Sequence, residues 1–180
     1  MKLSFLSWFV AILVPLALIG LGIRTLLTPF FLQIDYNMPY FPPDEYGFTK
    51  EDRLKWAPYA LDYLVNSADI SYLGDLKFDD GTPLFNEREL SHMEDVKAVF
   101  LPLNKLGMGL SLVLAGLLLV AQRRAWRLDL VAGIRRGGWL TFGVVAALGL
   151  FAVISFWTFF ESFHALFFEG DSWRFLYSDS

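Results

Sequence analysis

The sequence has no cysteine and only two histidines, His92 and His164. Without cysteine the protein cannot form a disulfide, a thiolate metal site or a cysteine nucleophile, and it cannot carry a lipid on a cysteine of its own. Two histidines are too few for most histidine-based metal sites. A metal site that joined them to Asp95 or Glu161 would lack the HExxH spacing of zinc proteases. Metal chemistry therefore has no motif in its favour.

Several catalytic signatures are missing as well. The sequence has no G-x-S-x-G nucleophile elbow and no phosphate-binding P-loop. The H-x4-D pattern of acyltransferases fails because Lys97, not an aspartate, follows His92 by five residues. Charge is also scarce, since 19% of the 180 residues are charged, compared with about 25% in a typical soluble domain. No stretch is basic enough to indicate a nucleic-acid partner.

Hydrophobic residues make up 55% of the chain and gather in three runs, Phe5–Leu27, 98–121 and 139–160. The hydrocarbon core of a bilayer is about 30 Å thick and needs about 20 helical residues, so each run can span it. The first run is longer than the apolar core of a signal peptide, and we expect it to remain as a span. The sequence thus predicts an all-α membrane protein, a single membrane domain over 1–180 with three transmembrane helices.

Arginines set the expected orientation of these spans. Five of them lie between the second and third runs, where Asp129 supplies the one acidic charge: Arg123, Arg124, Arg127, Arg135 and Arg136. Cytoplasmic loops of membrane proteins are enriched in Lys and Arg, so we expect a loop over 122–137 on the cytoplasmic side. The amino terminus is then cytoplasmic, and residues 28–97 form an extracytoplasmic cap.

The cap is acidic and carries helix-start signals. Residues 28–99 contain fourteen acidic and six basic residues. Thr49 followed by Asp52 predicts a capped helix, and Asn86 followed by Glu89 predicts a second one that continues into the second span. Turn signals at 42–44 and 79–83 separate these segments.

The two histidines lie beside carboxylates at the outer ends of the predicted spans. Glu89 and Asp95 are three residues before and after His92, and Glu161 is three residues before His164, so these side chains can share helix faces. A histidine with a carboxylate partner can accept and return a proton near neutral pH. A lipid ester lies at the same interfacial depth. Aromatic residues near His164 would hold acyl chains and exclude water.

Plainer interpretations of the same residues remain open. A lone interfacial histidine is more often structural, and the phenylalanines near His164 are by default a lipid-facing belt. The carboxylates on the first turns after Asn86 are by default a solvated helix face. We expect the two histidines to face each other across a cleft at the outer interface. Histidines on opposite sides of the cap, or at different depths, would exclude a catalytic pair.

Three segments resemble the bacterial lipoprotein intramolecular transacylase family. Residues 86–97, NERELSHMEDVK, contain its E-x-x-H-M-x-D-V-K pattern, and Glu161-Ser162-Phe163-His164 with the following aromatic residues resembles its second histidine segment. Residues 46–49 with 52–53 resemble a further segment of the family in the cap. The resemblance covers nearly the whole chain. The segments matched after the third run are Phe167-Phe168 and Trp173-Arg174-Phe175.

The resemblance implies an activity and a site. Members move the sn-2 acyl chain of a diacylglyceryl-cysteine lipoprotein onto the α-amino group of that cysteine in the bacterial cell membrane, without a cofactor, and lyso-form lipoprotein results. The partners are then diacylglyceryl-modified lipoproteins and membrane lipids. His92 and His164 match the two catalytic histidines. We expect supporting roles for Arg88, Glu89, Asp95 and Glu161, and acyl-chain contacts from Phe163, Phe167, Phe168 and Trp173.

The family has four spans, and this sequence stops at Ser180, before the fourth. Two other functions remain as alternatives. In the first, the protein is a non-enzymatic membrane protein whose cap binds a partner or a lipid. In the second, the histidines serve a lipid-ester hydrolase. This second alternative needs ready access for water, which the aromatic surroundings of His164 disfavour.

Overall fold

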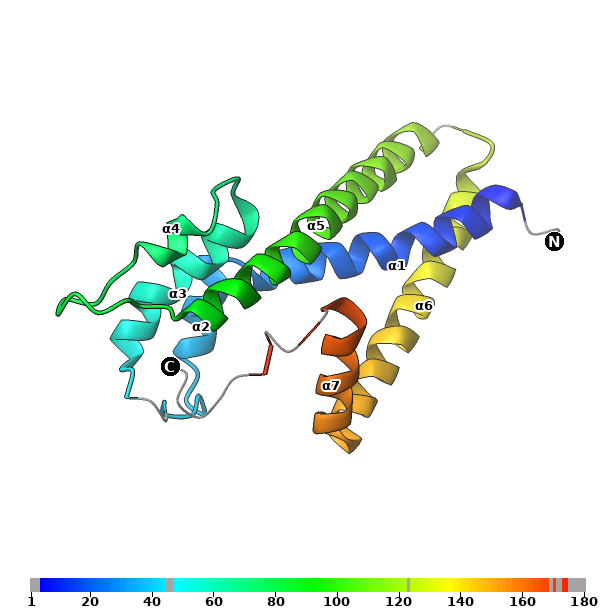
Figure 1. The fold of residues 1–180 in the computed structure, drawn as a ribbon. Coiled ribbons are helices and arrows are strands. Elements are labelled where there is room, and N and C mark those ends of the chain that lie inside the picture. Colours follow the sequence, from blue (N-terminus) through cyan, green and yellow to red (C-terminus); the bar gives the residue numbers. More distant parts are fainter. Residues whose placement is uncertain (1–3, 45–46, 123, 169, 171–172, 175–180) are drawn as a thin grey trace. The chain divides into compact units, whose positions relative to one another are not determined.

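The computed structural model describes residues 4–44, 47–122, 124–168, 170 and 173–174. Every regular element in these ranges is a helix, which confirms the all-α fold class. An isolated bridge between Lys77 and Pro83 closes a turn. The helices in chain order are α1 (Phe5–Leu26), α2 (Pro29–Tyr36), α3 (Lys50–Val65), α4 (Ser71–Gly74), α5 (Glu87–Ala121), α6 (Arg127–Ile154) and α7 (Phe156–Phe167) (Figure 1).

Three helices, α1, α5 and α6, are long and apolar enough to cross a membrane. Large apolar side chains on α5 and α6 are open to the surroundings: Leu112 is 73% exposed and Val153 is 85% exposed. Apolar surface of this extent would be unfavourable in water, whereas hydrocarbon tails are as apolar as these side chains. The exposed faces are those expected of helices surrounded by lipid.

The chain divides into two compact units, and the first comprises residues 1–24 and 103–162. Its core forms where α6 lies against α1, with Val10, Val14 and Leu130 almost fully buried. A methyl group built on Gly133 or Gly137 would come within 2.7 Å and 2.5 Å, respectively, of α1 atoms. Small residues four apart let membrane helices approach closely, so these glycines set the contact between α6 and α1.

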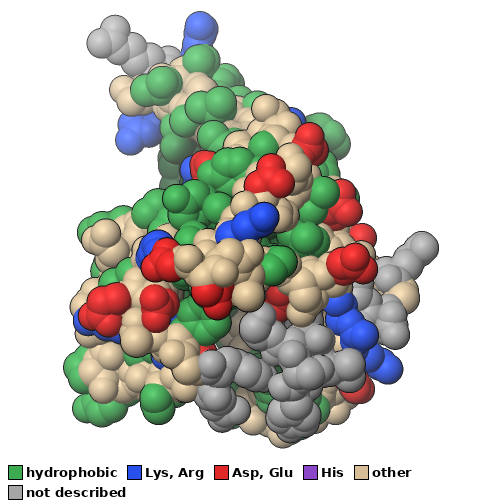
Figure 2. All heavy atoms as spheres, turned by 60° about the vertical axis from the view of Figure 1, so that its left-hand side comes forward, with side chains coloured by type: hydrophobic (Ala, Val, Ile, Leu, Met, Phe, Trp, Pro, Cys, Tyr) green, Lys and Arg blue, Asp and Glu red, His purple; other side chains and the backbone are tan. Residues whose placement is uncertain are grey.

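The second unit comprises residues 25–102 and 163–180. Tyr63 of α3 and Leu73 of α4 form its core together with Leu64, and apolar side chains from the first turns of α5 pack against them. The predicted capping box is confirmed, because Thr49 and Asp52 exchange hydrogen bonds at the start of α3. On the face drawn in Figure 2, acidic side chains in red lie among hydrophobic side chains in green and other atoms in tan.

Lys97 ties α5 to the segment that follows α3. Its Nζ donates hydrogen bonds to Asn66 Oδ1 at 3.2 Å and to the Ala68 carbonyl oxygen at 2.5 Å, and it lies 3.8 Å from the centre of the Tyr63 ring. A charged donor on two acceptors and an aromatic face holds the first turns of α5 against the end of α3.

The arginine-rich region differs from the sequence expectation. We expected a loop over 122–137, but α6 begins at Arg127, so Arg127, Arg135 and Arg136 are helical. Leu130, Gly133 and Gly137 are buried at helical spacing, so they form one face of a helix. This buried face explains why the helix includes the arginines. Arg123 lies outside the described residues. At the other end, Ser155 separates α6 from α7 with φ −149° and ψ 80°.

Candidate active site

His92 lies on α5, one turn after a capping box. The Asn86 N–H donates to Glu89 Oε2 at 2.8 Å, and the Glu89 N–H donates to Asn86 Oδ1 at 3.0 Å. The predicted cap is therefore confirmed, and Glu89, which is 9% exposed, holds the start of the helix. Its carboxylate fixes the helix that carries His92, a supporting role that the spacing of the two residues alone did not specify.

His164 lies in the last turn of α7 and meets His92 in the second unit. The two imidazole ring centres are 6.3 Å apart, and the ring planes are inclined by 31°. Both side chains are half-buried. The structure thus brings together the only two histidines of the sequence, which come from separate helices.

Aromatic rings surround this pair. Phe168 contacts both imidazoles, with its ring centre 5.3 Å from that of His92 and 5.7 Å from that of His164. Phe163 packs edge-on against His164 at 5.5 Å, and Phe167 lies against Phe163 at 4.9 Å. An apolar wall of this kind lowers the local dielectric and restricts water near the imidazoles.

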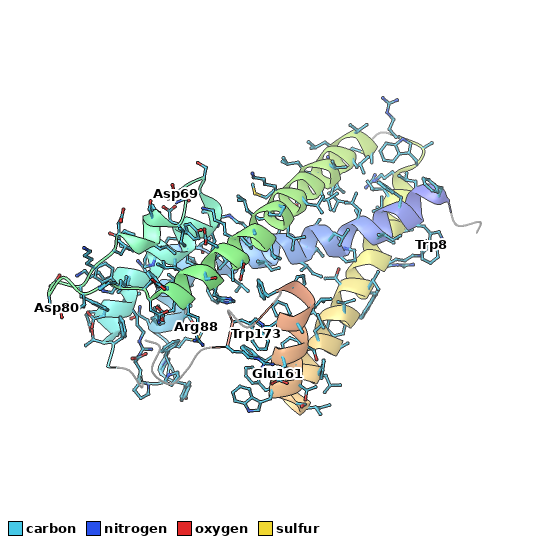
Figure 3. The ribbon with its side chains drawn as sticks, viewed as in Figure 1. Trp8, Asp69, Asp80, Arg88, Glu161 and Trp173 are labelled. Carbon is cyan, nitrogen blue, oxygen red and sulfur yellow. The ribbon has the colours of Figure 1, made fainter. Side chains whose placement is uncertain are left out.

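Trp173 covers His164 from a segment that follows α7. The indole is stacked on the imidazole with ring centres 4.9 Å apart and planes inclined by 29°, and Trp173 is 6% exposed. Arg88 Nη1 of α5 donates to the Arg174 carbonyl oxygen at 3.0 Å, and the Arg174 guanidinium lies 4.8 Å from the centre of the Trp173 ring. Arg88 and Trp173 lie next to each other in Figure 3. This contact connects the two histidine-bearing segments directly.

The sequence model of the lipoprotein intramolecular transacylase family, Lit, matches residues 8–180. The chain belongs to the Lit family. A relative, an uncharacterized protein of Aquifex aeolicus (strain VF5), is 30% identical over 179 residues, which cover 97% of this chain and 78% of the relative. No solved structure matches the chain.

The remaining predicted site residues of this Lit family member lie along the same helices. Asp95 is half-buried on α5, one turn beyond His92, and Glu161 is exposed on α7, one turn before His164. Phe175 and Tyr46, which belong to the resembling segments, lie outside the described residues. Among the described residues no group of three or more His, Asp or Glu side chains could hold a metal ion.

The stacking of Trp173 on His164 could not be predicted from the sequence. We expected Trp173 to contact the substrate, and in the structure its indole stacks on the imidazole of His164. The Arg88 contact to the Arg174 backbone joins positions 86 residues apart. Because this bond uses a backbone acceptor, no residue type at position 174 could have signalled it.

Proposed function

We propose that this protein moves the sn-2 acyl chain of a diacylglyceryl-cysteine lipoprotein onto the α-amino group of the same cysteine, with His92 and His164 as the acid–base pair. The observation that carries the proposal is the meeting of these two imidazoles, 6.3 Å apart, in a chain of the transacylase family. The product is a lyso-form lipoprotein with one acyl chain on nitrogen and one on the glyceryl group.

The reaction needs one proton removed and one supplied. The cysteine amine attacks the ester carbonyl carbon, and the C–N bond forms as the amine gives up a proton. The tetrahedral intermediate then expels the glyceryl sn-2 oxygen, which takes up a proton as the C–O bond breaks. One imidazole accepts the first proton and the other hydrogen-bonds or protonates the leaving oxygen, so atoms and charge balance.

The separation of the imidazoles suits this exchange. General acids and bases act over heavy-atom distances of about 2.6–3.2 Å. Rings whose centres are 6.3 Å apart can therefore both reach one tetrahedral centre, whose nitrogen and oxygen are bonded to the same carbon. Donor and acceptor belong to one molecule, so alignment supplies much of the rate, on the order of 7–11 kcal/mol of barrier at best.

The aromatic wall favours transfer over hydrolysis. Phe168 contacts both imidazoles, and Phe163 and Phe167 extend the apolar surface along α7. These rings would hold the acyl chains against the histidines and keep water from competing with the amine. In this role Trp173 orients His164, and Arg88 and Glu89 orient the segments that carry the pair. Burial and the neighbouring His164 lower the pKa of His92, and Asp95 partly opposes this shift. Glu161 lies one turn before His164 on α7.

The orientation that we propose places this chemistry at the outer face of a bacterial cell membrane. The spans would cover about residues 5–27, 98–121 and 139–160, and residues 28–97 would form the extracytoplasmic cap. The 35 residues of α5 extend over about 52 Å, more than the 30 Å of a hydrocarbon core. Six of the residues 87–97 are charged, so His92 would lie outside the hydrocarbon, near the ester level.

Mass spectrometry of lipoprotein amino termini tests this function. A host that lacks the activity would express the wild-type chain, His92→Ala or His164→Ala. We expect an acyl chain on the cysteine amine with wild type and its loss with both variants. Diacylglyceryl anchors that stay unaltered beside a folded wild-type protein would instead favour a cap that binds a partner or lipid. Anchors that lose an acyl chain without gaining an amide would indicate a hydrolase.

A further inference from the structure

A groove of about 550 Å³ lies in the first unit, whereas the two histidines belong to the second. The first turns of α1 and the middle of α6 line it, and its walls combine basic, aromatic and small apolar side chains. The lining residues are Trp8, Ala11, Arg135, Arg136, Trp139 and Leu140. They include two arginines and no acidic residue.

One arginine of the groove is held in place. Arg136 Nη1 donates to Ser7 Oγ at 2.7 Å, Ser7 is 1% exposed, and the guanidinium lies 5.6 Å from the centre of the Trp8 ring. A guanidinium has five N–H donors, and this bond uses one of them. Arg135, the next residue along α6, is exposed. The groove therefore presents one guanidinium that is held in place, Arg136, beside a second that is exposed, Arg135. Two neighbouring guanidiniums suit a ligand with several anionic oxygens, such as a phosphate.

The groove lies at the boundary between the arginine-rich start of α6 and its uncharged remainder. No charged residue follows Arg136 before the end of α6 at Ile154, and none precedes Arg24 in α1. Trp8 and Trp139 are 52% and 70% exposed beside the arginines. Tryptophan is enriched at membrane–water interfaces, and arginine reaches from there to the headgroups. In the orientation proposed above, this level is the inner leaflet.

We propose that this groove binds the headgroup of an anionic phospholipid such as phosphatidylglycerol. The two guanidiniums would hold the phosphodiester oxygens, and the indoles of Trp8 and Trp139 would flank the glycerol. Leu140 would contact the start of an acyl chain. Two cations without an acidic neighbour favour a lipid with net negative charge over a zwitterionic one, whose ammonium group they would repel. This site is separate from the proposed acyl transfer.

Native mass spectrometry of the full chain, released from bilayers of equal phosphatidylglycerol and phosphatidylcholine with identical acyl chains, tests this site. We expect wild type to retain phosphatidylglycerol selectively. Arg135→Gln should lower its occupancy about fivefold, the effect of one basic side chain near an anionic lipid. Arg127→Gln removes the same charge from α6 outside the groove and serves as the matched control, which should retain the lipid.

Three results would overturn the proposal. The first is equal retention of the two lipids, and the second is equal loss in Arg135→Gln and Arg127→Gln, which would indicate attraction by overall charge. The third is displacement of phosphatidylglycerol by millimolar glycerol 3-phosphate, which would indicate a site for a free phosphate. Trp139→Leu provides a second variant because it keeps both arginines. Unchanged occupancy in that variant would also contradict the site as drawn.

Discussion

The stacking of Trp173 on His164 predicts by how much kcat should fall when the indole is removed. Trp173→Leu removes the aromatic face that lies 4.9 Å from the imidazole while keeping an apolar side chain. An aromatic pair contributes about 0.5–1.5 kcal/mol beyond the area it buries. If that energy orients the imidazole in the transition state, its loss lowers kcat by about 2- to 12-fold, since 1.36 kcal/mol corresponds to tenfold in rate.

The assay is the initial rate of acyl transfer on a diacylglyceryl-cysteine peptide, measured with purified protein at saturating substrate. Trp173→Phe keeps a ring on His164 and should recover most of kcat. Trp157→Leu removes an indole that is 73% exposed and contacts Phe156 and Phe160, so it serves as the control. A Trp173→Leu enzyme with wild-type kcat, or a Trp173→Phe enzyme as slow as Trp173→Leu, would refute a positioning role.

Three further predictions concern the scaffold. Gly137→Leu should destabilise the protein by about 1–3 kcal/mol in detergent unfolding because the new side chain overlaps α1, whereas Gly143→Leu, where nothing lies within 4 Å, should leave stability nearly unchanged. Lys97→Met removes both hydrogen bonds that tie α5 to the cap and should cost about 1–3 kcal/mol in the same assay; an unchanged midpoint would contradict this. Hydrogen bonds from the Thr49 side chain and backbone lower the pKa of the Asp52 carboxyl from its ordinary 3.8. The stabilisation is therefore complete above pH 3.8 and is lost as the pH falls through the folded-state pKa, so hydrogen-exchange protection of α3 should fall with pH in that range, and less so in Thr49→Val.

Much of the fold follows from one-dimensional patterns that act locally. Apolar runs long enough for a bilayer predicted the three long helices, and the cap signals at Thr49 and Asn86 predicted where α3 and α5 begin. The start of α6 was missed because arginines suggested a loop. An arginine has good helix propensity, so its charge reports on topology and not on the end of a helix.

The sequence indicated candidate site residues but not how they are arranged in space. The Asn86–Glu89 spacing predicted the cap at the start of α5, whereas the spacing of Glu89 from His92 indicated only that the two side chains can share a helix face. The approach of His92 to His164, and the return of Trp173 onto it, depend on tertiary contacts between segments far apart in the chain. Hydrophobic periodicity contains no information on such contacts.

The proposed function requires that acyl transfer occurs within one substrate molecule at the His92–His164 pair. The most direct measurement uses purified protein and a diacylglyceryl-cysteine peptide whose sn-2 chain is deuterated, mixed with an unlabelled peptide of different sequence. Transfer within one molecule should give a deuterated amide on the first peptide, unchanged total mass and no label on the second, and both histidine-to-alanine variants should be inactive. Free deuterated fatty acid, label on the second peptide, or full activity in either variant would contradict it.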